Sequence, residues 1–258
     1  MIENNIFSLL AKLRKKSLKL PLNNIKQIAL RPSTVDGESL YSLPFVKSLS
    51  KEYILTLFLP MDSNAKYFRR FKTKIIEYPT KLNIFKVFNF KRRMGNLSFD
   101  LFINLDRNNI DTFSFILNNP LTASIYEGAS VNLLAISNSI PIDESYERLS
   151  SLLGFKLQWG KELIRIRKRK YKDKKMGITS DIGKYPGFLQ VNKAEDLYKI
   201  SSLITRKNQI STIAFFLDIP QVLLLKEGDE FRPPASIKVF RYSKSITGEI
   251  IENCLKIL

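Results

Sequence analysis

The segment 25–49 constrains the fold more than any other part of this 258-residue chain. Residues 25–30 are typical of a buried strand, and a turn of small residues with Gly37 and Glu38 follows them. Apolar residues then recur at three-residue steps, the stripe of a helix that lies on a sheet. They are Leu40, Leu43, Val46 and Leu49. Because open α/β sheets bind ligands at the carboxyl ends of their strands, this turn is a candidate site.

The remaining sequence continues the alternation of strands and helices, which predicts parallel sheets covered on both faces. We expect a basic amphipathic extension at 1–20, a Rossmann-like lobe at 21–155 and a second such lobe at 156–258. In the second lobe, strands are expected at 176–180, 188–191, 221–225 and 237–240, and helices at 194–203 and 243–258. In the first lobe, six residues should lie in adjacent parallel strands: Ile28, Leu30, Leu57, Leu59, Leu101 and Ile103.

Several motifs, taken in chain order, resemble one enzyme family. Gly37-Glu38 and Leu43-Pro44 stand where the lipopolysaccharide heptosyltransferases (glycosyltransferase family 9) have a Gly-Asp turn and a helix reading Leu-x-x-Leu-Pro. Residues 99–106 match the apolar strand of that family with its early acid. Further matches lie at 54–60, 74–78, 123–128, 141–155, 194–204 and 211–225. The resemblance implies an α/β fold of the GT-B type, with two Rossmann-like lobes, parallel sheets, an interlobe cleft and a shortened second lobe.

The resemblance also implies a catalytic role for the first turn. In the family, a carboxylate at this place takes the proton from the acceptor hydroxyl as that oxygen attacks the anomeric carbon of the sugar. Glu38 occupies the position, Asp36 takes its role if the turn is shifted, and Gly37 is the residue of close approach. The alternative for Glu38 is a carboxylate that the dipole of the following helix stabilises and that does nothing else.

The donor site departs from the pattern of the family, which has an Asp-Thr-Gly-x-x-His loop in its second lobe. This chain contains no histidine, and Lys207, Asn208 and Gln209 replace Asp-Thr-Gly while Thr212 replaces the histidine. Arg206 and Lys207 can still pair with a phosphate as point charges. The donor or anion contacts that the resemblance leaves are Gly37, Arg206, Lys207, Asn208 and Thr212.

Basic residues outnumber acidic ones by 42 to 24, and a net charge of +18 implies an anionic partner or surface. One basic cluster follows the apolar positions of the N-terminal segment, a pattern typical of a helix on an anionic bilayer. Nucleic acid is the alternative on charge alone, although the sequence carries no RRM, KH, zinc-finger or basic-zipper signature. The residues assigned to this anion-binding surface are Lys12, Arg14, Lys15, Lys16, Arg167, Lys168, Arg169 and Lys170.

Composition limits the chemistry further. Without histidine, Ser-His-Asp and Cys-His catalysis and histidine-ligated metals are excluded, and the single cysteine, Cys254, excludes an internal disulfide. No apolar run approaches the roughly 20 residues that span a bilayer, and no secretory signal is visible. We therefore expect a cytoplasmic protein, peripheral at the inner membrane face, that uses neither a metal nor a cofactor.

Three hypotheses of function follow. The first is a heptosyltransferase-like glycosyltransferase that uses a nucleotide-diphosphate sugar and acts on a cell-surface glycan, a lipid-linked acceptor or a lipopolysaccharide precursor. The second is a catalytically degenerate protein of the same fold that serves as a basic binding or assembly module. The third, a nucleic-acid binder, rests on charge alone.

Overall fold

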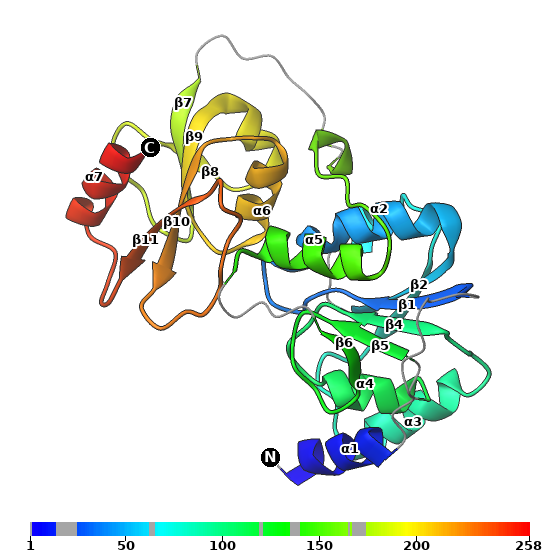
Figure 1. The fold of residues 1–258 in the computed structure, drawn as a ribbon. Coiled ribbons are helices and arrows are strands. Elements are labelled where there is room, and N and C mark those ends of the chain that lie inside the picture. Colours follow the sequence, from blue (N-terminus) through cyan, green and yellow to red (C-terminus); the bar gives the residue numbers. More distant parts are fainter. Residues whose placement is uncertain are drawn as a thin grey trace. The chain divides into compact units, whose positions relative to one another are not determined.

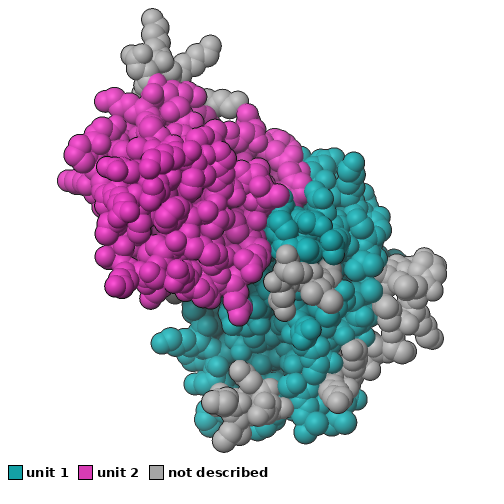
Figure 2. Space-filling model, turned by 60° about the vertical axis from the view of Figure 1, so that its left-hand side comes forward, with its two compact units in different colours: residues 1–35, 42–158 teal, residues 36–41, 159–258 magenta. Residues whose placement is uncertain are grey.

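The computed structural model describes residues 2–13, 25–61, 65–118, 121–134, 140–164, 166 and 174–258. These residues form two compact units, which Figure 2 draws in different colours. Unit 1 comprises residues 1–35 and 42–158, and unit 2 comprises residues 36–41 and 159–258. The short segment 36–41 therefore belongs to the second unit, although it follows the first strand of the chain.

Unit 1 is built on a six-stranded sheet in which every pair of neighbouring strands is parallel. The strand order is β3-β2-β1-β4-β5-β6, the doubly wound Rossmann order, whose topological switch point lies between β1 and β4. The six residues expected in adjacent parallel strands lie in β1, β2 and β4, which confirms that prediction. The strands are β1 (Gln27–Arg31), β2 (Ile54–Pro60), β3 (Lys74–Tyr78), β4 (Leu101–Asn104), β5 (Leu121–Ser124) and β6 (Val131–Leu134).

Helices cover both faces of this sheet (Figure 1). On one face lie α2 (Leu43–Glu52), which follows the 3-10 turn η1 (Ser39–Ser42), and α5 (Ile142–Leu152). On the other face lie α3 (Ile84–Met94) and α4 (Ile110–Ile116), with α1 (Ile2–Leu13) outside them. The short turn η2 (Ala65–Tyr67) follows β2. Among the helices of the described ranges, none is long and apolar enough to cross a membrane.

The two faces of the unit 1 sheet have cores of different composition. Toward α2, the predicted apolar positions Leu43, Val46 and Leu49 are buried. Leu40, which belongs to unit 2, is buried as well, so the strand–turn–helix interpretation is confirmed. Toward α3 and α4, the core is rich in aromatic rings, including Phe58, Tyr78, Phe90, Phe102 and Phe113. Ring pairs in this cluster meet mainly edge to face, the geometry that aromatic quadrupoles favour.

Unit 2 has a five-stranded parallel sheet of order β11-β10-β9-β7-β8. This is a flavodoxin-like order, and its switch point lies between β7 and β9. The helices α6 (Gln209–Phe216) and α7 (Gly248–Ile257) lie on opposite faces of the sheet (Figure 1). The prediction of two Rossmann-like parallel sheets is confirmed. The remaining elements are η3 (Lys161–Leu163), β7 (Lys175–Thr179), β8 (Leu189–Val191), η4 (Ala194–Lys199), β9 (Ile200–Arg206), β10 (Gln221–Lys226) and β11 (Lys238–Tyr242).

The predicted helix at 194–203 is wrong beyond its first turns. Residues Ala194–Lys199 form the short 3-10 helix η4, and the chain then enters β9 at Ile200. The start of η4 is capped, because the carboxylate of Asp196 accepts hydrogen bonds from the amides of Asn192 and Lys193. However, β9 pairs with both β7 and β10, so tertiary pairing and burial decide its structure.

Candidate active site

The candidate site begins with the close approach of Gly37 to the start of α6. A Cβ added to Gly37 would lie 2.6 Å from the backbone oxygen of Asn208, and Gly37 has a φ of +76°. Both features require glycine here, because L side chains rarely adopt such a φ and need space that the Asn208 backbone occupies. The hydroxyl of Thr212 donates a hydrogen bond to the carbonyl oxygen of Gly37. The turn is therefore fixed on α6 through backbone atoms.

Tyr41 anchors the other end of the same segment. Its ring is 1% exposed and packs against three phenylalanine rings of unit 2, with centroid distances of 5.6 Å to Phe215 and 6.3 Å to both Phe216 and Phe231. Burying an aromatic ring of this size contributes substantially to packing. Gly37 and Tyr41 together explain why residues 36–41 cluster with unit 2.

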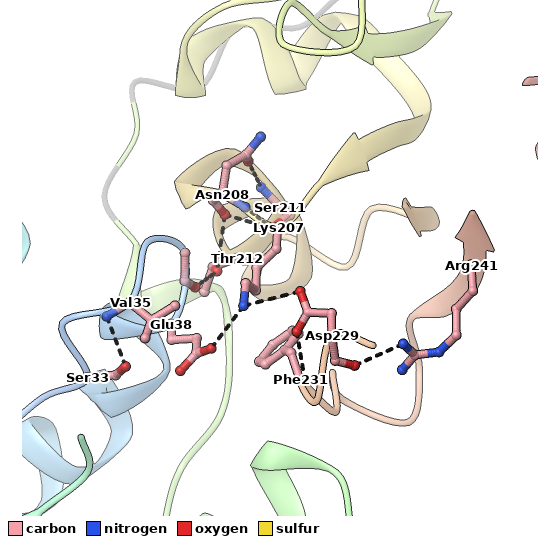
Figure 3. Close-up of polar contacts among 11 residues, drawn as sticks. Ser33, Val35, Glu38, Lys207, Asn208, Ser211, Thr212, Asp229, Phe231 and Arg241 are labelled. Carbon is pink, nitrogen blue, oxygen red and sulfur yellow. Dashed lines mark hydrogen bonds and ion pairs between the residues drawn. The ribbon is translucent and has the colours of Figure 1, made fainter. Parts of the chain in front are cut away.

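An ion pair joins the two predicted functional groups of the site (Figure 3). The Nζ of Lys207 lies 3.4 Å from Oε1 of Glu38 and 3.6 Å from Oδ2 of Asp229. The Glu38 side chain is 0% exposed, whereas that of Lys207 is 19% exposed. A carboxylate buried this deeply needs a charged or hydrogen-bonding partner, and the ammonium of Lys207 is such a partner for Glu38. The ammonium also stands 5.0 Å from the centroid of the Phe231 ring, a cation–π contact.

The loop that follows β10 supplies the second carboxylate. Oδ1 of Asp229 accepts a hydrogen bond of 2.9 Å from the amide of Phe231, and its backbone oxygen accepts one of 2.9 Å from Nη1 of Arg241 (Figure 3). These bonds hold Asp229 and Phe231 beside Lys207. Sequence reasoning missed both residues, because their contact with Lys207 depends on the return of a loop that no local pattern indicates.

The first turn of α6 is capped by its own side chains. Oδ1 of Asn208 accepts a hydrogen bond of 3.0 Å from the amide of Ser211, and the Ser211 hydroxyl accepts one of 3.2 Å from the amide of Asn208. The side-chain amide of Asn208 also donates to Oδ2 of Asp181, at 3.2 Å. This capping box explains why α6 begins here, and it uses two of the N–H groups that a bound anion would otherwise meet.

Two other nitrogen atoms at this end of α6 are buried without an acceptor. Within the described part of the chain, Nε of Arg206 and Nε2 of Gln209 have no hydrogen-bond partner. Buried N–H donors are nearly always paired, with protein, solvent or ligand. Arg206 and Gln209 flank Lys207 and Asn208 in the sequence. They lie at the carboxyl end of β9, which is one side of the switch point of unit 2. Open α/β sheets bind ligands at this place.

The structure brings most of the predicted site residues together. Gly37, Glu38, Lys207, Asn208 and Thr212 form one contact network in unit 2. Arg206 lies beside it at the end of β9, whereas the side chain of Asp36 is exposed. The predicted anion-binding residues are not placed: Arg14, Lys15, Lys16, Arg167, Lys168, Arg169, Lys170 and the side chain of Lys12 lie outside the described residues.

A second polar cluster lies at the switch point of unit 1, and no pattern in the sequence indicated it. The guanidinium of Arg31, at the end of β1, forms an ion pair of 3.1 Å with Asp106, and the two side chains are 2% and 0% exposed. Arg31 also donates to the hydroxyl of Tyr78 at 3.1 Å and to Oδ1 of Asn104 at 3.2 Å. Burial raises the pKa of Tyr78 despite the opposing effect of Arg31, so its hydroxyl stays protonated at neutral pH. The cluster satisfies itself and is structural.

Comparisons with known proteins identify the fold. No protein-family model matches the sequence, and a comparison with curated protein sequences finds no match either. The glycosyl transferase family 9 structure from Veillonella parvula DSM 2008 matches with a TM-score of 0.57 at 14% identity, over 94% of this chain and 93% of that chain. E. coli heptosyltransferase WaaC with ADP-2-deoxy-2-fluoro heptose matches with a TM-score of 0.59 at 9% identity, over 90% and 99%. E. coli ADP-heptose lipopolysaccharide heptosyltransferase II gives 0.53 at 14%, over 87% and 92%.

These likenesses confirm the GT-B-like α/β fold that the sequence resemblance implied. The matches extend over nearly the whole length of both chains, so both units take part in them.

Proposed function

We propose that this protein is a heptosyltransferase-like glycosyltransferase. It would transfer a sugar from a nucleotide diphosphate to a hydroxyl group of a cell-surface glycan or lipopolysaccharide precursor at the inner membrane face. One observation carries the proposal: at the carboxyl end of β9, the candidate base Glu38 contacts Lys207, and two buried N–H donors beside Lys207 lack acceptors. A diphosphate would supply acceptors for both donors.

In this proposal, Lys207 and Arg206 bind the diphosphate and Gln209 donates a hydrogen bond to it. When a phosphate oxygen takes the ammonium of Lys207, Glu38 loses a counter-ion and becomes available as a base. The acceptor oxygen then attacks the anomeric carbon, the bond from that carbon to the diphosphate oxygen breaks, and the acceptor proton passes to Glu38. The basic side chains stabilise the charge that develops on the leaving diphosphate, and the proposal includes no metal or other cofactor.

A second candidate function is that of a catalytically degenerate binding or assembly module. The capping box of Asn208 and Ser211 favours it, because it already uses amides of α6 that a donor would meet. The position of Lys207 between Glu38 and Asp229 favours it too, since an incoming phosphate must compete with two carboxylates. Both candidates share the fold and differ in whether a nucleotide binds.

Thermal unfolding with nucleotide diphosphates separates the two. For an enzyme, one of ADP, UDP, GDP or CDP should raise the melting temperature, with about 2.7 kcal/mol of stabilisation at a hundred times its dissociation constant. Lys207→Ala should abolish this shift, whereas Lys244→Ala, an exposed lysine of the same unit, should keep it. A flat response to all four nucleotides at millimolar concentration rejects the glycosyltransferase proposal and leaves the degenerate module.

Substitution of the two turn carboxylates tests the base. Glu38→Gln should keep the nucleotide-dependent shift and lose turnover, because it removes a proton acceptor and no donor contact. Asp36→Asn, at an exposed position in the same turn, should keep both. If Asp36→Asn instead removes turnover while Glu38→Gln retains it, then Asp36 is the base and the register of the turn is shifted.

A further inference from the structure

Exposed apolar side chains gather on two helices of unit 1. Of the ten large hydrophobic side chains exposed in the described part of the chain, five lie on α1 or α3. Phe85 is 78% exposed and Leu13 is 75% exposed, which is far beyond the exposure of a residue at the rim of a core. We call the five side chains the α1–α3 face: Ile6, Leu9 and Leu13 on α1, and Phe85 and Phe88 on α3.

The exposure of this face does not come from poor packing of the two helices. The opposite side of α3 is buried through Val87, Phe90 and Met94. Phe7 of α1 is 3% exposed, and its ring lies 5.3 Å from that of Phe115 and 6.3 Å from that of Phe88. Both helices therefore pack on the rest of unit 1 through one apolar side and carry a second apolar side that is exposed. Figure 1 shows α1 as the outermost element on this side of the sheet, with α3 beside it.

The two helices carry little negative charge, because α3 has no acidic residue and α1 has one, Glu3, in its first turn. Residues 4–35 and 78–99 contain neither Asp nor Glu but include twelve lysines and arginines. On α3, Lys86, Arg92 and Arg93 have exposed side chains next to the two exposed phenylalanines. A mixture of aromatic, aliphatic and cationic side chains on one surface is the composition of helices that lie in the headgroup region of a bilayer.

We propose that the α1–α3 face docks this protein on an anionic lipid bilayer. Phe85 and the apolar side chains of α1 enter the boundary between headgroups and acyl chains, while the basic residues of α3 meet lipid phosphates. The aliphatic stripe of α1 favours lipid over nucleic acid, because a phosphodiester backbone offers it nothing to bury against. A second copy of the chain is disfavoured by charge, since two faces of the same positive sign repel each other. This inference is independent of catalytic activity.

Co-sedimentation of the full chain with vesicles tests the proposal. We expect binding to phosphatidylcholine vesicles that contain 30% phosphatidylglycerol, much weaker binding to pure phosphatidylcholine, and a loss of binding as salt rises. The charge variant K86E/R92E should lower the partition coefficient at least tenfold. Its control, K51E/K156E, changes the net charge equally at exposed lysines of α2 and the loop after α5, on the other face of the sheet, and should bind as the unmodified protein does.

A second pair of variants tests the apolar part separately. Phe85→Ser should lower the partition coefficient about tenfold, and Leu152→Ser, at an exposed leucine of α5, should leave it unchanged. Circular dichroism and melting temperature establish that each variant is folded. Equal losses in test and control variants, or equal binding to neutral and anionic vesicles, would overturn the proposal. The proposal would also be overturned if the variants of the α1–α3 face lost affinity for duplex DNA, or changed the oligomeric state, while their vesicle binding persisted.

Discussion

The carbonyl oxygen of Asn208 stands where the side chain of any residue other than glycine would have to lie at position 37. A Cβ built on Gly37 comes within 2.6 Å of that oxygen and within 2.8 Å of the Asn208 nitrogen. Both obstacles are backbone atoms, so no side-chain rotation relieves them. The contact between the turn after β1 and the start of α6 is therefore possible only with glycine.

Gly37→Ala should consequently destabilise unit 2 by about 2–4 kcal/mol, from a strained positive φ together with the forced displacement of backbone. Trp159, the single tryptophan, reports on this unit because its ring stacks on Phe216 at 6.0 Å. Denaturation followed by its fluorescence measures the loss. Gly187→Ala is the matched control, since Gly187 has a φ of +81° but nothing within 4 Å of an added Cβ. Gly187→Ala should lower the free energy of unfolding only by the cost of a positive φ, about 1–2 kcal/mol. Equal losses of stability in the two variants would contradict the close-approach argument.

The buried pair in unit 1 leads to a second prediction. Arg31→Met leaves the carboxylate of Asp106 buried without its cation and should lower the free energy of unfolding by about 3–5 kcal/mol. The double variant R31M/D106N removes both charges and should be less destabilised than the sum of the two single variants. Urea titrations of all three proteins measure this coupling.

The surface pair Arg148–Glu144 serves as the control for that experiment. Its atoms are 2.7 Å apart, closer than those of Arg31 and Asp106, but its side chains are 55% and 48% exposed. Arg148→Ala should lower the free energy of unfolding by no more than about 0.5 kcal/mol. A loss as large as that of Arg31→Met would show that burial does not decide the strength of these pairs.

The fold could be predicted from the sequence where a local pattern is compatible with only one type of secondary structure. The segment 25–49 combined a strand, a turn with glycine and a stripe of apolar residues at helical spacing, and the structure confirms each part. The segment after Asn192 combined a genuine helix start with a β-branched sequence, and the position of β9 at the centre of a sheet decided between them. Pairing with β7 and β10 is not visible in the residues of β9.

For the candidate site, the sequence indicated residues but not their contacts. Glu38 and Lys207 were both named from their places along the chain, yet the ion pair between them joins positions 169 residues apart. Asp229 and Phe231 complete the surroundings of Lys207 only because the loop after β10 returns to it. Arg31 gave no signal either, because a buried arginine is recognisable only from its partners.

Cys254 provides a reporter for the packing of α7. The residue is 0% exposed, and burial raises the pKa of its thiol to about 11. At pH 8 almost none of it is thiolate, so a disulfide reagent should react only when α7 opens. Thr247→Ala removes the cap that accepts a hydrogen bond from the amide of Ile250. This change should cost about 1 kcal/mol and accelerate labelling about fivefold.

Ser245→Ala, at an exposed position before the helix, is the control for the labelling experiment and should leave the rate unchanged. Rapid labelling of the unmodified protein at a rate near that of a free thiol would show that α7 does not cover Cys254 in solution.

The carboxylate of Asp196 predicts a dependence of stability on pH. Burial by itself raises the pKa of Asp196, but the hydrogen bonds from Lys199 and from the amide of Asn192 outweigh burial and lower that pKa overall. A carboxyl group with a lowered pKa stabilises the folded state above its unfolded pKa of about 3.9, and the stabilisation disappears as pH falls through the folded value.

Asp196→Asn should therefore be less stable than the unmodified protein by about 1–2 kcal/mol at pH 7. The difference in free energy of unfolding between the variant and the unmodified protein should narrow below about pH 4. The exposed neighbour Glu195→Gln should differ by less than about 0.5 kcal/mol throughout. A gap for Asp196→Asn that stays constant from pH 7 to pH 3 would mean that the charge of this carboxylate does not hold the turn before β9.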